Sequence, residues 1–365
     1  MVYRAIGLMS GSSLDGLDIA FVSFEEIRGK WTFELRQQKC VAYSDEWKKR
    51  LKDAVNLNAR DFMQLDHELG VWMGSAVKEF IENNALDHQV QLIVNHGHTV
   101  FHEPENGFTT QIGSGAAIAA INSINVIDQL RSLDVALGGQ GAPLVPMGEK
   151  LLFPDYNCFL NIGGIANISF HKTDGVQAFD VTVANQALNY LAALNGSAYD
   201  KDGQCAASGH ISTALLTGLN KLAYFGQPAP KSLANQFFTS SIQPLLDNAE
   251  LSVADKLCTF TAHIAAQIAY AAGAALAESA AEQEKKILIT GGGAHNRFLV
   301  QRIQAALAPH GIQADVAETA VIDYKEAIIM GLLGVLRWRE ENTVLENTGA
   351  SRASIGGAVW IGQPY

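Results

Sequence analysis

Hydrophobic and polar positions follow the same order at two places along the chain. In each half, an apolar run, a turn of small residues and a second apolar run succeed one another: 5–9, 10–16 and 17–22 in the first half, and 158–162, 163–164 and 165–170 in the second. Such runs around turn residues are typical of β-hairpins. Residues 31–41 and 176–180 are expected to add a third strand to each hairpin. The repeated order therefore suggests a duplicated architecture.

Longer segments show apolar residues at helical spacing. They predict a helical region over residues 47–83, helices over 185–194, 253–284, 298–307 and 325–339, and buried strands over 91–94 and 286–290. Strands that alternate with helices indicate the α/β class. The apolar stretch 264–281 is mostly alanine and carries Gln267 and Glu278, so it predicts a buried helix and not a membrane span.

The length of 365 residues corresponds to about two domains. We expect an N-terminal domain over 1–130 and a C-terminal domain over 131–365, with the last helix as a candidate to pack back on the first domain. Hydrophobic residues make up 48% and charged residues 17%, which supplies a packed core. The net charge of −11 repels a phosphate backbone, so nucleic acid is not expected as a partner.

Four separated cysteines without a Cys-x-x-Cys pair argue against a zinc site and a disulfide scaffold, and fit a reducing compartment. The chain reaches a glycine-containing motif by Gly7, which leaves no room for a signal peptide. We therefore expect a cytoplasmic protein without membrane association.

Two glycine turns are candidates for anion binding. The first contains Gly11, Ser12, Ser13, Leu14, Asp15, Gly16, Leu17 and Asp18. Glycines let successive N–H groups converge on an anion, hydroxyls add donors, and Asp15 or Asp18 can orient magnesium through water. The alternative is an ordinary hairpin turn. The second, Gly163-Gly164, is a tight turn on its own, but two such loops from two domains can hold a triphosphate.

A third glycine turn, Gly291-Gly292-Gly293-Ala294-His295-Asn296, lies between a predicted strand and a predicted helix. Gly291 and Gly293 match the first two glycines of the dinucleotide fingerprint, but Asn296 replaces the third. The hypothesis of an NAD-dependent dehydrogenase rests on this turn alone. We favour a turn against which the adenosine part of a nucleotide packs.

Asp180 ends a predicted strand, where a carboxylate can act as a base in the ligand crevice of an α/β sheet. The alternative is an Asp that caps the next helix. His96, His98 and His102 suggest a metal cluster, but no acidic or cysteine ligand follows at a recognisable spacing, so a polar substrate-contact loop is favoured.

The chain resembles the anhydro-N-acetylmuramic acid kinases, a branch of the actin, sugar-kinase and Hsp70 superfamily. The matching runs extend over nearly the whole chain: residues 9–16, 96–100, 134–146, 160–168, 199–200, 291–296 and 348–350. The Gly-Gly-Gln-Gly-Ala-Pro-Leu run at 138–144 and the Asn-Ile-Gly-Gly-Ile-Ala-Asn run at 161–167 are the most specific.

The resemblance implies two ribonuclease-H-like domains around a nucleotide-binding cleft, a homodimer, and ATP with Mg²⁺. It assigns Gly11 to Asp18 to the first phosphate loop, Gly163 and Gly164 to the second, and Gly291, Gly292 and Gly293 to the adenosine motif. Asp180 falls on the catalytic aspartate. The implied sugar-binding residues are Ser10, His96, Arg131 and Glu326.

The implied reaction joins hydrolysis to phosphorylation. Water attacks the anomeric carbon of a 1,6-anhydro amino sugar, Asp180 activates that water, and O6 takes the γ-phosphoryl group of ATP. The implied product is N-acetylmuramic acid 6-phosphate, formed in cell-wall recycling. The alternative is a nucleotide-binding protein of the same fold without sugar chemistry.

Several positions depart from the common family pattern. Ser12 replaces a threonine, Ser114 replaces an aspartate, and Gln129-Leu130-Arg131 stands for Asp-Phe-Arg with an aspartate one place early at Asp128. After Asp180, Val181-Thr182-Val183-Ala184 lacks two glycines and a proline, and the Pro-Lys-Ser-Thr-Gly run reads Pro230-Lys231-Ser232-Leu233-Ala234. Asp180 itself is retained.

Overall fold

A computed structural model of the chain divides into two compact units. Unit 1 comprises Met1–Pro154 and Tyr324–Tyr365, and unit 2 comprises Asp155–Asp323. The structure describes all residues except 12, 142–143, 173–174, 235, 277–283, 346–348 and 363–365. The division differs from the expected boundary after residue 130, because α4 (Ser132–Ala136) contacts β5 and α5 (Val145–Leu152) contacts β3, both in unit 1.

The sheet of unit 1 has the strand order β12-β6-β4-β1-β2-β3, with β5 paired to β4. Strand β1 is antiparallel to β2 and parallel to β4, β2 is antiparallel to β3, and β4 is parallel to β6. The strands are β1 (Val2–Ser10), β2 (Gly16–Ile27), β3 (Lys30–Ala42), β4 (Leu92–Glu103), β5 (Phe108–Ile112), β6 (Val126–Asp128) and β12 (Ala358–Trp360).

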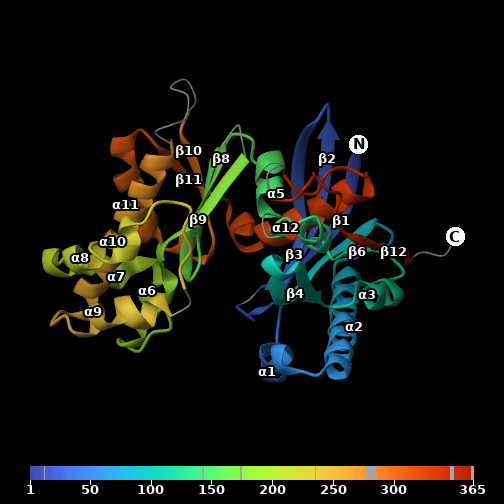
Figure 1. Cartoon of the computed structure of the whole chain (residues 1–365), viewed down its shortest axis with the longest axis horizontal. Helices are drawn as coiled ribbons and strands as arrows, with labels where there is room; N and C mark the ends of the chain where they lie inside the picture. The colour runs from blue at the N-terminus through green and yellow to red at the C-terminus, as the bar shows by residue number, and fades with distance from the viewer. Residues whose placement is uncertain are drawn as a thin grey trace. The chain divides into compact units, whose positions relative to one another are not determined.

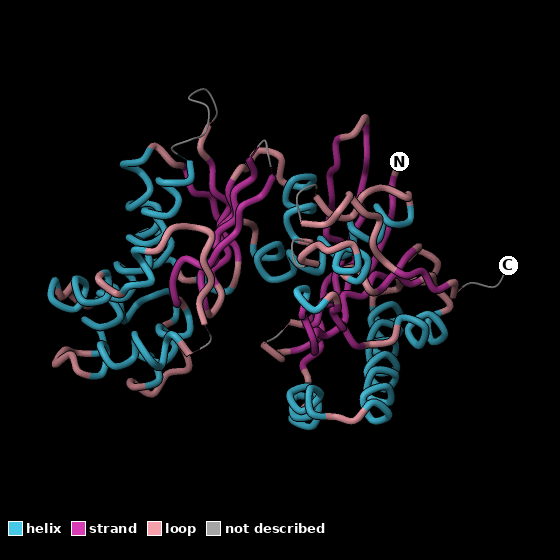
Figure 2. Tube along the Cα trace, in the orientation of Figure 1, coloured by secondary structure: helices cyan, strands magenta, loops and turns pink. Residues whose placement is uncertain are grey.

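The sheet of unit 2 repeats this arrangement in the order β11-β10-β7-β8-β9. Its strands are β7 (Cys158–Ile162), β8 (Ile165–Lys172), β9 (Gly175–Val183), β10 (Lys286–Thr290) and β11 (Gln313–Val316). The β7–β8 and β8–β9 pairs are antiparallel, and β10 is parallel to both β7 and β11. Figure 2 shows one sheet with adjacent helices in each unit. The predicted α/β class and the duplicated ribonuclease-H-like sheet are confirmed.

Successive residues of β1 face opposite sides of the first sheet. Ile6 and Leu8 are fully buried in the core cluster that also contains residues of α2 (Ala59–Asn83). Gly7 faces the other way, where an added Cβ would lie 1.9 Å from the carbonyl oxygen of Ala327 in α12 (Thr319–Trp338). Only glycine allows this close approach of strand and helix.

The helical region expected over 47–83 consists of two helices and a short 3₁₀ turn. Helix α1 (Asp45–Asp53) is followed by η1 (Ala54–Asn56), and α2 then begins with its own cap. The Asn58 side chain accepts a hydrogen bond from the Asp61 N–H, as an N-cap residue does. Helix α3 (Gly115–Asn122) completes the layer on this face by packing on α2.

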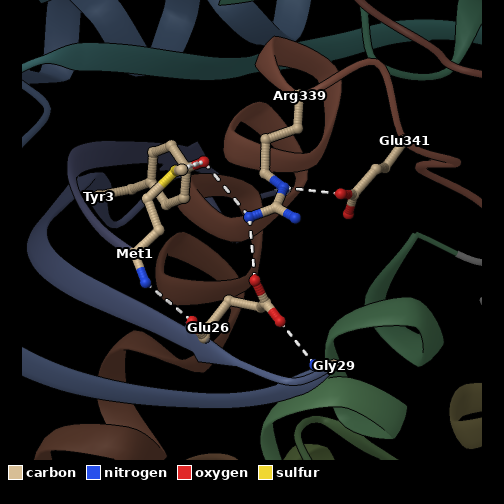
Figure 3. Close-up of polar contacts among 6 residues, drawn as sticks. All are labelled: Met1, Tyr3, Glu26, Gly29, Arg339 and Glu341. Atoms are coloured by element: carbon tan, nitrogen blue, oxygen red, sulfur yellow. Dashed lines mark hydrogen bonds and ion pairs between the residues drawn. The ribbon is translucent and has the colours of Figure 1, made fainter.

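A cluster around Arg339 ties the chain after α12 to the start of unit 1 (Figure 3). The Arg339 guanidinium donates to Glu341 at 2.6 Å and to the Tyr3 hydroxyl at 3.3 Å, and lies 3.4 Å from a Glu26 carboxylate oxygen. The Met1 amino group donates to the Glu26 carbonyl at 2.8 Å. The C-terminal segment is thus fixed to β1 and β2 by charge as well as by packing.

The helices of unit 2 gather around α10 (Val253–Leu276), which is buried along most of its length. In Figure 1, α10 and α11 lie on the same side of the second sheet, and both helices contact its strands. The predicted end of α10 at residue 284 falls next to 277–283, which lie outside the described residues. Among the helices that the structure describes, none is long and apolar enough to cross a bilayer. The other helices are α6 (Asn185–Ala193), α7 (Gln204–Ser208), α8 (Thr213–Asn220), α9 (Gln243–Asp247) and α11 (Arg297–Leu307).

Short 3₁₀ or π segments connect several of these elements. They are η2 (Pro104–Asn106), η3 (Lys201–Gly203), η4 (Ala223–Gly226), η5 (Phe238–Ile242), η6 (Gly292–His295) and η7 (Ala308–His310).

Candidate functional site

The first glycine turn joins β1 to β2 in unit 1. Its backbone closes through a hydrogen bond from the Leu14 N–H to the Gly11 carbonyl at 3.3 Å, and Leu14 is buried with φ at 59°. Ser13 and Asp15 are exposed on the turn. Ser12 lies outside the described residues. The burial of Leu14 anchors the turn, so the exposed serine and aspartate face solvent.

Three of the predicted loop residues belong to the sheet itself. An added Cβ at Gly16 would lie 2.5 Å from the Val41 carbonyl oxygen, and Leu17 is fully buried. Asp18 pairs across the strands with Cys40. Burial and the hydrogen bond to Asp18 raise the pKa of the Cys40 thiol to about 12. These residues therefore have structural reasons for their identity besides any ligand.

Ser10 is buried at the end of β1, where its hydroxyl lies between the Tyr43 hydroxyl and the His98 ring. The Tyr43 hydroxyl donates to Ser10 Oγ at 2.8 Å, and Ser10 Oγ lies 3.0 Å from His98 Nδ1. Because the Ser10 oxygen already accepts from Tyr43, its own proton is available for His98. Burial lowers the pKa of His98 and raises that of Tyr43 to about 12, so both stay neutral at pH 7. The Ser10 hydroxyl therefore uses its proton and one of its two lone pairs within the protein.

His96, Arg131 and Glu326 come together in unit 1. His96 Nδ1 lies 2.9 Å from the Gly97 carbonyl oxygen, and its Nε2 accepts from Arg131 Nε at 3.0 Å. This pair of bonds defines the Nδ1–H tautomer. Burial, with the adjacent Arg131 charge, lowers the pKa of His96 to about 3. Burial also lowers the pKa of Arg131, while the attraction of Glu326 opposes that shift. His96 therefore orients the guanidinium as a neutral acceptor.

The histidines of this region do not form a metal cluster. Ring nitrogens of His96 and His98 are used as described, and His102 Nδ1 lies 3.0 Å from the Thr109 hydroxyl. Among the residues that the structure describes, no group of three His, Cys, Asp or Glu side chains has a metal-binding arrangement.

The Gly163-Gly164 hairpin lies against the start of α6 in unit 2. The Gly164 carbonyl accepts from the Ala184 and Gln186 N–H groups at 2.8 and 3.2 Å, and the Gly163 carbonyl accepts from the Asn185 N–H at 3.1 Å. Strands β7 and β10 are parallel, so the turn that begins at Gly291 follows β10 at the same sheet edge. An added Cβ at Gly292 would approach the Asn185 side chain at 3.9 Å. The structure therefore brings the second and third glycine turns together.

The glycines of these turns fall into two groups. At Gly291 and Gly293, an added Cβ would lie 2.5 Å from the Asn161 side chain and 2.2 Å from that of Ile162. Packing on β7 therefore explains both. The second group consists of Gly11, Gly163, Gly164 and Gly292. None of these four glycines has a positive φ, and an added Cβ at any of them would meet no atom within 3.3 Å. Glycine there leaves space for a ligand to approach the backbone.

Asp180 is half-buried on β9, and β9 runs three residues beyond it to Val183. The expectation that the strand ends at Asp180 is wrong, because the β-branched residues Val181, Thr182 and Val183 extend it into the core. Asp180 pairs with Asn167, and the register shifts between Ala166 and Asn167. A bulge of this kind changes the direction of the adjacent side chain.

Asp180 does not cap the next helix. The N-cap position of α6 is Ala184, without a side-chain cap. The Asp180 carboxylate instead accepts from the Leu233 N–H at 2.9 Å and from the Ser232 hydroxyl at 3.2 Å. The departure from the family pattern at Leu233 leaves this contact intact, because a backbone N–H donates whatever the side chain.

The sequence analysis singled out no role for four residues that contact Asp180 or support those contacts: Tyr224, Lys231, Ser232 and Leu233. The Pro-Lys-Ser run was a visible signal in the sequence. Its separation of some 50 residues from Asp180 hid the contact, since nothing local connects the two segments.

The two sheets define an α/β protein built from two ribonuclease-H-like units, each with a glycine turn after its first strand. The sequence profile of the family described as Anhydro-N-acetylmuramic acid kinase matches residues 3–362. The chain is 34% identical to the anhydro-N-acetylmuramic acid kinase of Vibrio vulnificus (strain CMCP6), covering 96% of both chains. It is 31% identical to that of Sulfurimonas denitrificans, covering 97% of this chain and 98% of the relative. The chain belongs to the anhydro-N-acetylmuramic acid kinase family.

Proposed function

We propose that the chain is an ATP-dependent kinase that opens 1,6-anhydro-N-acetylmuramic acid with water and phosphorylates its O6. The products are N-acetylmuramic acid 6-phosphate and ADP. The family match over residues 3–362 carries this proposal. The half-buried carboxylate of Asp180, on the strand that leads to α6, supports it.

In the proposed reaction, one carboxylate is sufficient. Asp180 accepts a proton from water as the water oxygen bonds to C1 of the sugar. The C1–O6 bond breaks, O6 bonds to the γ-phosphorus, and the bond from that phosphorus to the β-phosphate oxygen breaks to release ADP. A glycosidase protonates the departing oxygen with a second carboxylic acid. Here the phosphorus takes the electron pair of O6, so no second acid is needed.

Residues of unit 1 are proposed to bind the sugar. His96 holds Arg131 through Nε, so the terminal N–H groups of the guanidinium remain for an anionic or carbonyl oxygen. Glu326 is exposed on α12 and adds an acceptor for sugar hydroxyls. Ser10 stays a prediction as a sugar contact, and its shared hydroxyl favours a role in fixing the end of β1.

The glycine turns are proposed to bind ATP through the backbone. Gly11, Gly163, Gly164 and Gly292 leave open space where phosphate or adenosine atoms can approach. Mg²⁺ prefers one or two carboxylates together with water and phosphate oxygens. The exposed Asp15 of the turn fits that donor set, and Asp18 follows it in β2. Bound Mg²⁺ supplies positive charge that stabilises the transferring phosphoryl group.

A labelled-water assay tests the proposed reaction. The protein with ATP, Mg²⁺ and 1,6-anhydro-N-acetylmuramic acid in H₂¹⁸O should release ADP and a sugar phosphate with one heavy oxygen at C1. Phosphorylation without the label would reject the hydrolytic step. ATP binding without any sugar phosphate would instead favour a nucleotide-binding protein that lacks sugar chemistry.

We also propose that the chain is a cytoplasmic homodimer that acts in cell-wall recycling. The family resemblance supports all three statements. The cysteines Cys40, Cys158, Cys205 and Cys258 are free thiols, which suits a reducing compartment. Sedimentation should give a species of twice the chain mass of 39.2 kDa, and a monomer would reject the dimer.

A further inference from the structure

A distant segment fixes the backbone of Asp180 from the outer side of β9. The Asp180 N–H donates to the Lys231 carbonyl at 3.0 Å, and the Tyr224 hydroxyl donates to the Asp180 carbonyl at 2.6 Å. Strand β9 is the last strand of its sheet, so its outer edge is open to such contacts. Both backbone groups of Asp180 are therefore bound by residues 224 and 231.

The two anchoring residues also hold each other. The Lys231 ammonium donates to the Tyr224 carbonyl at 3.0 Å and lies 4.5 Å from the centre of the Tyr224 ring. Burial and the negative charge of Asp180 raise the pKa of Tyr224 above its usual value, so its hydroxyl stays protonated and donates. The segment that follows Lys231 is thereby fixed relative to Asp180.

Both donors to the Asp180 carboxylate reach the same oxygen atom. The Leu233 N–H and the Ser232 hydroxyl bind Oδ2, at 2.9 and 3.2 Å. Among the described residues, none donates a hydrogen bond to Oδ1. The last torsion of an aspartate side chain is broad, so it needs such contacts to hold one orientation. Two donors on one oxygen fix the carboxylate plane and leave the other oxygen open.

We propose that Ser232 is a positioning residue for Asp180, and that Oδ1 is the atom that takes the proton from water. This inference rests on the proposed function. Ser232 and Leu233 act through Asp180, because they bind the oxygen that does not take the proton. Without the Ser232 hydroxyl, the Leu233 N–H alone holds the carboxylate, and Oδ1 spends less time in the productive direction.

The test compares Ser232→Ala with Ser232→Thr in the full-length protein. Ser232 is exposed, so both variants are expected to fold. In Ser232→Ala, kcat should fall about tenfold while the KM values for sugar and ATP change less than about twofold. Ser232→Thr should restore kcat to within about threefold of the wild type.

Ser240→Ala is the matched control, because Ser240 is an exposed serine whose hydroxyl contacts Ser241 and not Asp180. It should match the wild type. Unchanged kinetics in Ser232→Ala would overturn the inference while the proposed function stands. A raised KM for the sugar with an unchanged kcat would also overturn it, since Ser232 would then contact substrate. A wild-type protein without turnover would overturn both proposals.

Discussion

Each unit places a carboxylate near the open end of its second hairpin, but on a different strand and in different surroundings. In unit 1, Asp18 of β2 pairs with Cys40 of β3, two residues from the pair Gly16 and Ala42 that opens the ladder. In unit 2, Asp180 of β9 pairs with Asn167 of β8, next to the Ala166–Thr182 pair. The acidic residue thus lies on the second strand of the sheet in unit 1 and on the third strand in unit 2.

This difference shows how one sheet topology gives two chemical environments. The register of β2 and β3 is regular at Asp18, and the carboxylate binds the Cys40 thiol across the strands. The register of β8 and β9 shifts beside Asp180, and its carboxylate faces a separate segment that binds one oxygen. The sheet topology determines where the carboxylate lies, and the neighbouring atoms determine which of its oxygens is free of hydrogen-bond donors.

The largest expected effect is that of Asp180→Asn. Asparagine can place its carbonyl oxygen where Oδ2 accepts from Ser232 and Leu233, so the fold is kept while the proton acceptor at Oδ1 is lost. Loss of a general base predicts a fall in kcat of about 10³- to 10⁴-fold, with nucleotide binding retained. Asp155→Asn, at an exposed carboxylate of the same unit, is the control. Turnover within tenfold of the wild type would exclude Asp180 as the base.

The next effect compares close glycine contacts in the two units. Gly7→Ala would bring a Cβ to 1.9 Å from the Ala327 carbonyl oxygen, and Gly293→Ala to 2.2 Å from the Ile162 side chain. Because the Gly7 contact is with backbone, Gly7→Ala should reduce the free energy of unfolding by about 3 kcal/mol, and Gly293→Ala by about 2 kcal/mol. Urea unfolding measures both.

The open glycines are the controls for this comparison. Gly11→Ala and Gly292→Ala meet no atom closer than 3.6 Å, so the free energy of unfolding should change by less than about 1 kcal/mol. The KM for ATP should rise about tenfold instead, since the methyl group occupies the proposed ligand space. A normal KM for ATP in both variants would contradict the assignment of these turns.

Acid should destabilise both units through a buried neutral histidine. Burial lowers the pKa of His96 in unit 1 and of His263 in unit 2 from 6.5 to about 3. The unfolded chain takes up a proton near pH 6.5, and the folded chain does so only near pH 3. Above about pH 6.5, neither histidine changes the free energy of unfolding. Between about pH 6.5 and pH 3, each histidine lowers the free energy of unfolding by about 1.4 kcal/mol for every unit by which the pH falls.

His263→Gln tests this in unit 2. Between pH 6.5 and pH 5, the variant should lose about 2 kcal/mol less unfolding free energy than the wild type. His67→Gln, at an exposed histidine of α2, should follow the wild type. A parallel pH dependence in wild type and His263→Gln would show that His263 titrates normally in the folded protein.

The smallest effect concerns the Asp18–Cys40 pair. Cys40 is exposed, but its raised pKa keeps the thiolate scarce. Asp18→Asn removes the charge that disfavours the thiolate, so iodoacetamide should modify Cys40 about three to ten times faster at pH 8.5. Cys205, whose pKa is raised by burial and by Asp200, is the internal control in the same peptide map. An unchanged Cys40 rate would contradict the pairing.

The sequence predicted the central strands accurately, because their patterns are strong and local. The bounds of β7 and β10 are those expected, 158–162 and 286–290. Strands β6, β11 and β12 contain only three or four residues, too few for a periodic signal. The helical region over 47–83 was predicted without its division into α1 and α2, because the apolar pattern continues across the cap at Asn58.

For the candidate site, the sequence predicted the residues but not the contacts that they make. Asp180, the glycine turns and the group of His96, Arg131 and Glu326 were all identified in the sequence. The anchoring of Asp180 by Tyr224 and Lys231 was not, because each lies more than 40 residues away along the chain.

The amino-acid sequence alone determined the α/β class, the duplicated hairpins and the candidate site residues, because these depend on patterns within a few residues. Only the tertiary structure decided which glycines are required by packing, which histidines are neutral and which oxygen of Asp180 is open. Those properties depend on atoms that folding brings together from distant parts of the chain, and no local pattern records them.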